Sequence, residues 1–155
     1  EQQCLQGWQL EIVGTDISQR VLHQARRGIY GRSAFRMTDD YYLLKYFEPQ
    51  DGSFRIADRV RQLVSISYLN LLDRTRMAML GSFDLIFCRN VIIYFDLAVK
   101  KQVIASFHGA LRDGGFLLLG HSESLMNIST LFTLRHYKND MVYQKPLLSS
   151  AGGMS

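Results

Sequence analysis

Polar side chains follow three strands that the sequence predicts, and their types suit the binding of a polar ligand. These side chains are Asp16, Asn70, Arg89 and Asn90. A carboxylate between a strand and a helix is where Rossmann-type folds hold ribose hydroxyls. Because the carboxyl ends of parallel strands lie along one edge of a sheet, we expect these side chains to meet at one crevice. The structural alternative is that they cap helices and loops.

The stretch 83–95, F-D-L-I-F-C-R-N-V-I-I-Y-F, combines an expected strand with residues that could act on a ligand. Its short apolar run, 85–87, follows a Gly-Ser turn and predicts a strand buried on both faces of a parallel sheet. Tyr94 supplies a hydroxyl to the otherwise apolar segment that comes next. We interpret this strand end as the floor of an active site. Tyr94 could also be a core tyrosine whose hydroxyl reaches the surface.

Alternation of strands and helices with short loops predicts an α/β sheet that positions these residues. Ser18 and Gly28 are expected to begin and end the helix after the first strand. Asp96 should cap a second helix, in which apolar residues recur every four positions up to Leu111. A Gly-Gly pair at 114–115 should end that helix before the next strand.

Residues 30–65 are expected to form a small helix-plus-hairpin insertion on the main sheet. Thr38 should cap a helix that reaches Phe47 and ends at Pro49. From 54 to 68 apolar residues share one parity, while arginines take the other. This alternation predicts antiparallel strands with one face in water.

Length and composition fit a globular protein of one domain: 155 residues, 47% hydrophobic and 21% charged. We expect a partial domain over 1–146, closed by a hairpin at 131–144, and a disordered tail at 147–155. The two cysteines and four histidines do not have the spacing of metal ligands, so we expect no metal. Two cysteines also offer no disulfide framework, so we expect a cytoplasmic location. No run is long enough for membrane insertion. The net charge of +4 favours acidic partners, but without interleaved aromatics we expect no nucleic acid.

A Gly-rich turn is expected about 20 residues before a ribose-binding acid. Before Asp16 the sequence contains only two isolated glycines, Gly7 and Gly14, and neither lies in a Gly-rich turn about 20 residues upstream. Either this chain does not bind a nucleotide, or the first strand of the fold is missing from it. A central strand without its neighbour is a sticky edge, which favours self-association.

Four motifs, in the same order, closely resemble those of the CheR chemoreceptor methyltransferases. They are G-T-D-I-S at 14–18, N-L-L-D at 70–73, F-D-L-I-F-C-R-N-V-I-I-Y-F-D at 83–96 and G-H-S-E-S at 120–124. That family uses S-adenosylmethionine to methylate glutamate side chains on the cytoplasmic helices of bacterial chemotaxis receptors, and the product is S-adenosyl-L-homocysteine. The resemblance covers residues 10 to 145.

The resemblance implies a role for each matched residue. Asp16 would hold the ribose hydroxyls, and Tyr94 would be the catalytic tyrosine near the transferred methyl. The other implied cofactor contacts are Asn70, Leu71, Arg89 and Asn90. A glutamate carboxylate is already ionised near neutral pH, so the reaction needs no general base. Catalysis would consist of aligning the carboxylate with the methyl–sulfur bond and excluding water.

The implied fold is a Rossmann-like S-adenosylmethionine-dependent methyltransferase sheet, incomplete at its N-terminal side. It would carry an inserted antiparallel β-subdomain and a C-terminal β-hairpin. In some members this subdomain binds a receptor tail peptide, but the turn between Phe47 and Phe54 is shorter here, which argues against that route. His121 and Glu123 are expected to be a loop histidine and a capping or ion-paired residue outside the site. The alternative is a non-catalytic receptor- or partner-binding module with a vestigial or truncated cofactor site.

Overall fold

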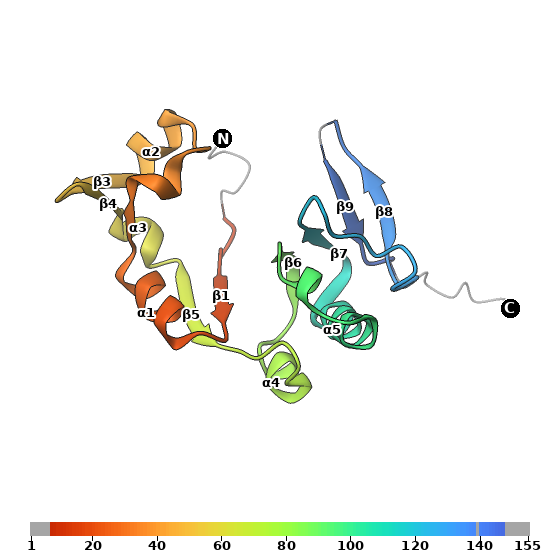
Figure 1. Cartoon of the computed structure of the whole chain (residues 1–155). Helices are drawn as coiled ribbons and strands as arrows, with labels where there is room; N and C mark the ends of the chain where they lie inside the picture. Colours follow the sequence, from red (N-terminus) through yellow and green to blue (C-terminus); the bar gives the residue numbers. More distant parts are fainter. Residues whose placement is uncertain (1–6, 139, 148–155) are drawn as a thin grey trace, which may run out of the picture. The chain divides into compact units, whose positions relative to one another are not determined.

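This computed structural model describes residues 7–138 and 140–147, which belong to two compact units, Glu1–Asn70 and Leu71–Ser155 (Figure 1). Both units are mixed α/β structures with short parallel pairs and antiparallel strands. The predicted α/β class is therefore confirmed. All but the first residue of the predicted disordered tail lies outside the described residues.

A parallel pair of strands forms the base of the first unit. Strand β1 (Ile12–Asp16) pairs with β5 (Val64–Tyr68), and helix α1 (Gln19–Arg27) follows β1. The hydroxyl of Ser18 accepts the Val21 N–H and begins α1 as expected. Gly28 ends the helix in the left-handed region at φ 65°, where a Cβ would also lie 2.6 Å from a methyl of Ile56. Glycine is thus required here by both conformation and space.

An antiparallel sheet of three strands completes the first unit. It has the order β2 (Ile29–Gly31), β4 (Ser53–Ile56), β3 (Phe47–Gln50), and it lies beside the 3-10 helix η2 (Arg32–Phe35) and helix α2 (Asp40–Tyr46). Asp51 and Gly52 have φ values of 44° and 72° and make the tight turn between β3 and β4. Four aromatic rings from the sheet and η2 pack edge to face against one another. They belong to Tyr30, Phe35, Phe47 and Phe54.

Two predicted boundaries in this region are wrong. Helix α2 is capped by Asp39, whose carboxylate accepts the Tyr41 N–H at 2.8 Å, and not by Thr38. The helix already ends at Tyr46, and Pro49 lies inside strand β3. Strand β3 is at the edge of its sheet, where the missing N–H of a proline is tolerated.

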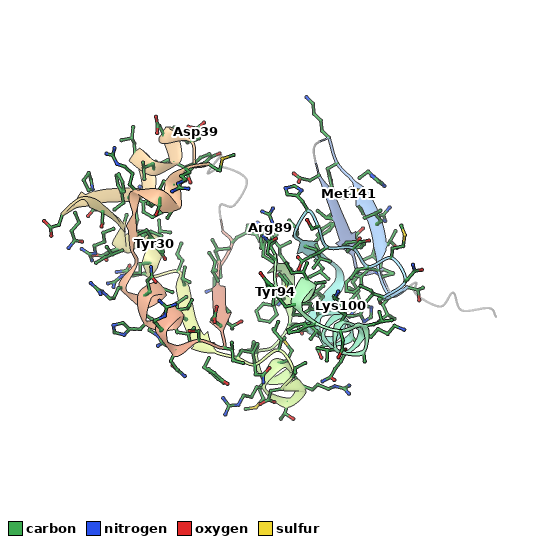
Figure 2. All side chains as sticks on the ribbon, viewed as in Figure 1. Tyr30, Asp39, Arg89, Tyr94, Lys100 and Met141 are labelled. Atoms are coloured by element: carbon green, nitrogen blue, oxygen red, sulfur yellow. The ribbon has the colours of Figure 1, made fainter. Side chains whose placement is uncertain are left out.

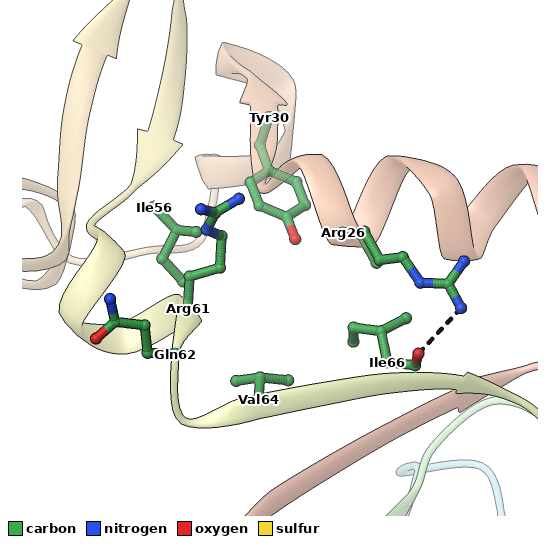
Figure 3. Close-up of a pocket in the computed structure, with 8 residues that line it drawn as sticks. Arg26, Tyr30, Ile56, Arg61, Gln62, Val64 and Ile66 are labelled. Atoms are coloured by element: carbon green, nitrogen blue, oxygen red, sulfur yellow. Dashed lines mark hydrogen bonds between the residues drawn. The ribbon is translucent and has the colours of Figure 1, made fainter.

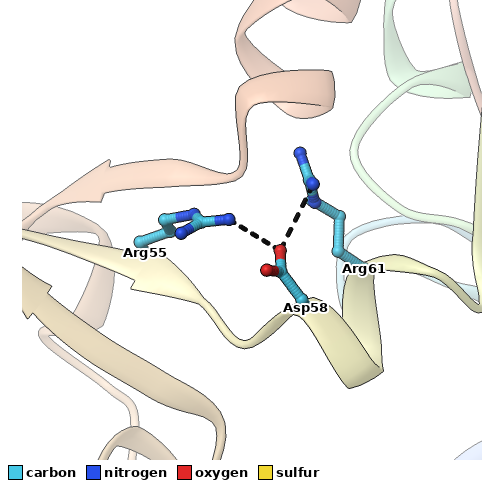
Figure 4. A network of polar contacts seen from close by, with 3 residues as sticks. All are labelled: Arg55, Asp58 and Arg61. Atoms are coloured by element: carbon cyan, nitrogen blue, oxygen red, sulfur yellow. Dashed lines mark hydrogen bonds and ion pairs between the residues drawn. The ribbon is translucent and has the colours of Figure 1, made fainter.

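The period of two over 54–68 does not correspond to continuous strands, and this prediction is also wrong. A short helix, α3 (Asp58–Arg61), separates β4 from β5. Arg55 and Arg61 approach the same oxygen of Asp58 at 2.7 and 3.2 Å (Figure 4). Asp58 is also favourable in the first turn of a helix, so these contacts support a helical turn here.

A pocket of about 320 Å³ lies among α1, β2, β4, α3 and β5 in this unit (Figure 3). Its floor is apolar and includes Ile56, Val64 and Ile66. Arg26 of α1 donates to the carbonyl of Ile66 at 3.0 Å. This bond ties the helix to strand β5 across the pocket.

The second unit is built on a sheet of four strands in the order β6-β7-β9-β8. The strands are β6 (Phe83–Cys88), β7 (Leu111–Leu119), β8 (Thr133–His136) and β9 (Met141–Gln144). Strands β6 and β7 are parallel, whereas β8 and β9 form the expected antiparallel hairpin. The helical segments are α4 (Arg74–Met79), η3 (Ile92–Tyr94) and α5 (Leu97–Ala110). Helix α4, which is capped by Asp73, has no counterpart in the predicted elements.

Helix α5 provides much of the core of the second unit. Its buried side chains are Val103, Ile104, Phe107 and Ala110. Asp96 caps it as expected, but it ends at Ala110, before the Gly-Gly pair predicted to stop it. Lys145 donates to the carbonyls of His108 and Leu111 at 3.1 and 2.8 Å, and these bonds satisfy backbone groups at the helix end.

Strand β6 is not buried on both faces, contrary to the prediction. Leu85 is 44% exposed and Phe87 is 65% exposed, while Cys88 is buried. Within the described ranges, β6 is also an edge strand, with β7 as its one strand neighbour. No helix in those ranges is long and apolar enough to span a membrane.

Candidate functional site

Asp16 is the last residue of β1 and lies opposite Tyr68 of β5. Its side chain is half-buried, and one carboxylate oxygen accepts the Ser18 N–H at 2.7 Å. The second oxygen accepts no hydrogen bond from any residue that the structure describes. Asp16 therefore has acceptor capacity for the hydroxyl groups of a ligand, which is what a ribose diol requires.

Asn70 follows β5 at the same edge of this parallel pair. The Leu69 N–H donates to the carbonyl of Asp16 at 3.1 Å, which holds the two strand ends together. Asn70 and Leu71 are the two residues that follow Leu69, and both are half-buried. The structure thus brings Asp16 and Asn70 to one strand edge, as the sequence predicts for parallel strands.

Arg89 and Asn90 come directly after β6, in the second unit (Figure 2). Both are exposed, and Asn90 has a φ of 60°. Asparagine is among the few residues that adopt this left-handed conformation readily. Arg89 and Asn90 therefore belong to a sharp turn at the carboxyl end of a strand. Asp16 belongs to the first unit, whereas Arg89 and Asn90 belong to the second. A single crevice that includes all three residues therefore stays a prediction.

Tyr94 ends the 3-10 helix η3 and is 81% exposed. Such exposure does not fit a core tyrosine, which was the structural alternative for this residue. The side chain is instead exposed, four residues after the turn at Asn90. Its catalytic role stays a prediction.

Glu123 organises the turn that carries these residues, and sequence reasoning placed it outside the site. It is only 9% exposed, and its carboxylate accepts four backbone N–H groups. One oxygen accepts from Gly120 at 2.7 Å and Asn90 at 2.8 Å, and the other from Val91 at 2.9 Å and Ile93 at 3.3 Å. These four bonds are termed the Glu123 clamp.

The protonation of Glu123 follows from this geometry. Burial alone would raise its pKa, but the hydrogen bonds from the four backbone amides outweigh burial and lower the pKa from its ordinary value of 4.5. The carboxylate is therefore charged at neutral pH. The expected capping function is confirmed, because the partners are backbone amides, and no ion pair involves Glu123 in the part of the chain described.

Gly120 is the residue that lets the clamp close. A Cβ there would lie 2.8 Å from a carboxylate oxygen of Glu123 and 3.0 Å from the Asn90 nitrogen, and it would overlap the Asn90 side-chain oxygen. The signal in the sequence was a glycine at the end of a buried strand with a carboxylate three residues later. That spacing was visible but is not specific enough to identify a clamp.

Cys88 is buried at the end of β6, whereas His121 lies in a loop. Burial, with the charge of Glu123 as a smaller cause, raises the pKa of the Cys88 thiol to about 12. A thiol that stays protonated is a poor nucleophile, so Cys88 is a small buried residue as expected. His121 is exposed in the loop after β7. The described residues include no group of three or more His, Cys, Asp or Glu side chains that could hold a metal ion.

Comparison with known proteins gives consistent results. Residues 1–141 match the family described as CheR methyltransferase, SAM binding domain. The chain is 38% identical over 138 residues to chemotaxis protein methyltransferase 2 of Vibrio cholerae, covering 88% of this chain and 48% of that protein. It is 36% identical over 137 residues to chemotaxis protein methyltransferase 1 of Pseudomonas aeruginosa, covering 87% and 49%.

A third relative extends the comparison to another genus. The chain is 36% identical over 129 residues to the chemotaxis protein methyltransferase of Salmonella typhimurium, covering 81% of this chain and 44% of that protein. The chain thus spans about half the length of the curated relatives it matches.

Proposed function

The chain belongs to the CheR methyltransferase family, and on this premise we propose that it is part of a protein-glutamate O-methyltransferase. The protein would transfer a methyl group from S-adenosylmethionine to glutamate side chains of chemoreceptors and so form glutamate methyl esters. The observation that carries the proposal is the family match over residues 1–141. The second carboxylate oxygen of Asp16 supports it, because this oxygen accepts no hydrogen bond from the residues that the structure describes.

The proposed cofactor contacts are those that the family resemblance implies, and they come at or after strand ends. Asp16 would accept the ribose hydroxyls, and Asn70 with Leu71 would lie beside the adenosyl group. Arg89 and Asn90 would add contacts from the turn after β6. When bound, S-adenosylmethionine supplies a methyl group that its sulfonium centre has already activated.

Tyr94 would act on the substrate side of the reaction. An exposed phenol can donate one hydrogen bond to a glutamate carboxylate and so fix the direction of its attacking oxygen. The substrate carboxylate is already ionised, so Tyr94 needs to orient it and not to remove a proton. Its role would be that of an orienting catalytic residue.

The organisation of the chain is part of the proposal. Residues 1–146 would be a partial methyltransferase domain, with 30–65 as an inserted β-subdomain and 147–155 as a disordered tail. The first strand and the Gly-rich cofactor loop would lie upstream of this chain. The relatives, of which this chain spans about half, are long enough to include such a part.

The proposed substrates are the cytoplasmic helices of chemoreceptors, which place the reaction in the cytoplasm. The net charge of +4 would assist the approach of these glutamate-bearing partners. We also propose self-association through an exposed sheet edge, because β1 and β6 each have one strand neighbour among the described residues. A strictly monomeric species in light scattering at high concentration would contradict self-association.

The experiment that tests the function is a methyl-transfer assay with methyl-labelled S-adenosylmethionine and a chemoreceptor cytoplasmic fragment. It uses this chain and a form extended upstream to the length of its relatives. We expect the extended form to label the receptor, and mild base to release the label as methanol, as for an ester. A receptor fragment with its acceptor glutamates changed to alanine is the control. Base-stable label, or no label at all, would contradict the proposed reaction.

The alternative, a non-catalytic module that binds a receptor or partner, predicts a different result. Both forms would then bind the receptor fragment with an affinity that S-adenosyl-L-homocysteine does not change, and neither would transfer a methyl group. The available oxygen of Asp16 favours the enzyme, since a vestigial site has no need to keep it.

A further inference from the structure

The loop after β6 is wrapped around a buried carboxylate that belongs to the loop after β7. We propose that Glu123 is a positioning residue, which acts through the clamp to hold Arg89, Asn90 and Tyr94 in the arrangement that methyl transfer needs. This inference rests on the proposed function, because it concerns the same site. The observation that carries it is a set of four hydrogen bonds to the Glu123 carboxylate, with N···O distances of 2.7 to 3.3 Å. Their N–H donors lie after two different strands, β6 and β7.

A buried charge is unfavourable unless it is fully hydrogen-bonded, so Glu123 would be a poor choice for simple packing. Here the carboxylate has one N–H partner after β7, at Gly120, and three after β6, at Asn90, Val91 and Ile93. The two strand ends are already neighbours, since Cys88 pairs with Leu119. The charged carboxylate of Glu123 therefore links the loop after β6 to the loop after β7. It is the acceptor for four backbone amides that would otherwise need another hydrogen-bond partner.

The clamp sets the conformation of the residues that flank it. Bonds from Asn90 and Val91 hold the peptide groups on either side of the left-handed turn, where φ is 60°. The bond from Ile93 holds η3, whose next residue is Tyr94. Arg89 precedes the turn directly. The clamp thus holds backbone amides, and it positions the exposed side chains of Arg89, Asn90 and Tyr94.

The clamp also limits what this loop can bind. Successive backbone N–H groups in a turn form a concavity that accepts anions. Glu123 already fills this concavity, so a carboxylate or phosphate of a ligand would have to displace it. The loop would consequently recognise its ligand through side chains, and its backbone amides would serve the fold.

The test compares Glu123→Gln, which keeps the size of the side chain, with two controls. Glu48→Gln makes the same chemical change on an exposed residue of β3, and Val142→Ala removes buried methyl groups from β9 without touching the clamp. Three quantities are measured for each in the chain and in the extended form. They are urea stability, affinity for S-adenosyl-L-homocysteine, and hydrogen exchange of the backbone amides at 90, 91 and 93.

We expect Glu123→Gln to speed exchange at these three amides and to weaken binding by about tenfold or more, since an amide nitrogen cannot accept their hydrogen bonds. Val142→Ala should lower stability yet leave binding unchanged under conditions where it is folded. Equal losses of affinity in Glu123→Gln and Val142→Ala at matched stability would show a merely structural role. Unchanged exchange at the loop amides would overturn the clamp itself.

The outcomes also separate this inference from the function beneath it. If the wild-type protein binds no S-adenosyl-L-homocysteine in either form, the proposed function fails and the positioning role fails with it. If the wild-type protein binds and Glu123→Gln binds equally well, with an unchanged kcat in the extended form, only the positioning role fails. In the extended form, a fall in kcat at unchanged KM for the cofactor would place the effect on Tyr94, whereas a rise in KM would place it on Arg89 and Asn90.

Discussion

Asp16 and Glu123 are both acidic residues at the carboxyl end of a parallel strand pair, one in each unit, and they are used in opposite ways. Asp16 is half-buried and accepts one backbone N–H, so one oxygen keeps its capacity for a ligand. Glu123 is buried and accepts four backbone N–H groups. The comparison teaches that a carboxylate at a strand end can serve either the ligand or the backbone. The number of hydrogen bonds already made distinguishes the two.

The difference also separates function from stability. Removing the charge of Asp16 should change what the protein binds, because the backbone depends little on it. Removing the charge of Glu123 should change the fold of the loop first and binding only through it. The predictions below test this division, beginning with the largest expected effect.

Glu123→Gln should lower the free energy of unfolding by about 3 kcal/mol, because an amide nitrogen replaces an oxygen that accepts two N–H groups. Urea unfolding of the second unit measures this. Asp16→Asn is the matched change at the other strand end and should cost less than about 1 kcal/mol, since an amide oxygen can still accept the Ser18 N–H. Equal costs for the two variants would break the comparison.

Gly120→Ala should destabilise the protein by about 2 kcal/mol, because the new methyl group would push on Glu123 and Asn90. Gly109→Ala is the matched control, since a Cβ at this position of α5 meets nothing within 4 Å. It should stabilise the helix by up to about 1 kcal/mol. Thermal unfolding of both variants gives the sign of each change, and a stabilising Gly120→Ala would argue against a closed clamp.

Tyr94→Phe should lower kcat about tenfold, which corresponds to the loss of one hydrogen bond to a charged group. Stability and affinity for S-adenosyl-L-homocysteine should not change, because Tyr94 is exposed and makes no contact that the clamp requires. Steady-state kinetics of the extended form, with calorimetry beside it, measures both. Parallel losses of kcat and affinity would instead identify a packing residue.

The dependence of stability on pH should show the smallest effect. The pKa of Glu123 in the folded protein lies below its ordinary value of 4.5, so its stabilising contribution is fully present above that value. The contribution is lost as the pH falls through the lower, folded-state pKa. The buried Cys88 beside it stays protonated over this range. Acid unfolding of wild type and Glu123→Gln should therefore converge at low pH, and curves that stay parallel would contradict this assignment.

Much of the fold could be predicted because local signals decided it. Ser18 and Gly28 mark the ends of α1 through a side-chain cap and a left-handed residue, and Asp96 marks the start of α5. The family resemblance, which rested on four short motifs, is confirmed by the match over residues 1–141. Signals of this kind do not depend on distant parts of the chain.

The remaining features depend on contacts that a single sequence does not reveal. Helix α3 is supported by the ion pairs of Asp58 with Arg55 and Arg61, and the apparent period of two over the same residues did not reveal these pairs. The end of α5 is set by Lys145, which lies more than thirty residues away in the chain. For the same reason the sequence left Glu123 open between a cap and an ion pair, since three of its four partners are thirty or more residues away.

The most direct test of the account is a calorimetric titration of S-adenosyl-L-homocysteine into the wild-type protein and into Asp16→Asn, each in the extended form. We expect the wild-type protein to bind and Asp16→Asn to lose at least about tenfold in affinity while its urea stability is almost unchanged, because the lost charge served the ligand. Equal affinities for two folded proteins would contradict it, since Asp16 would then be a capping residue and not the ligand-binding carboxylate.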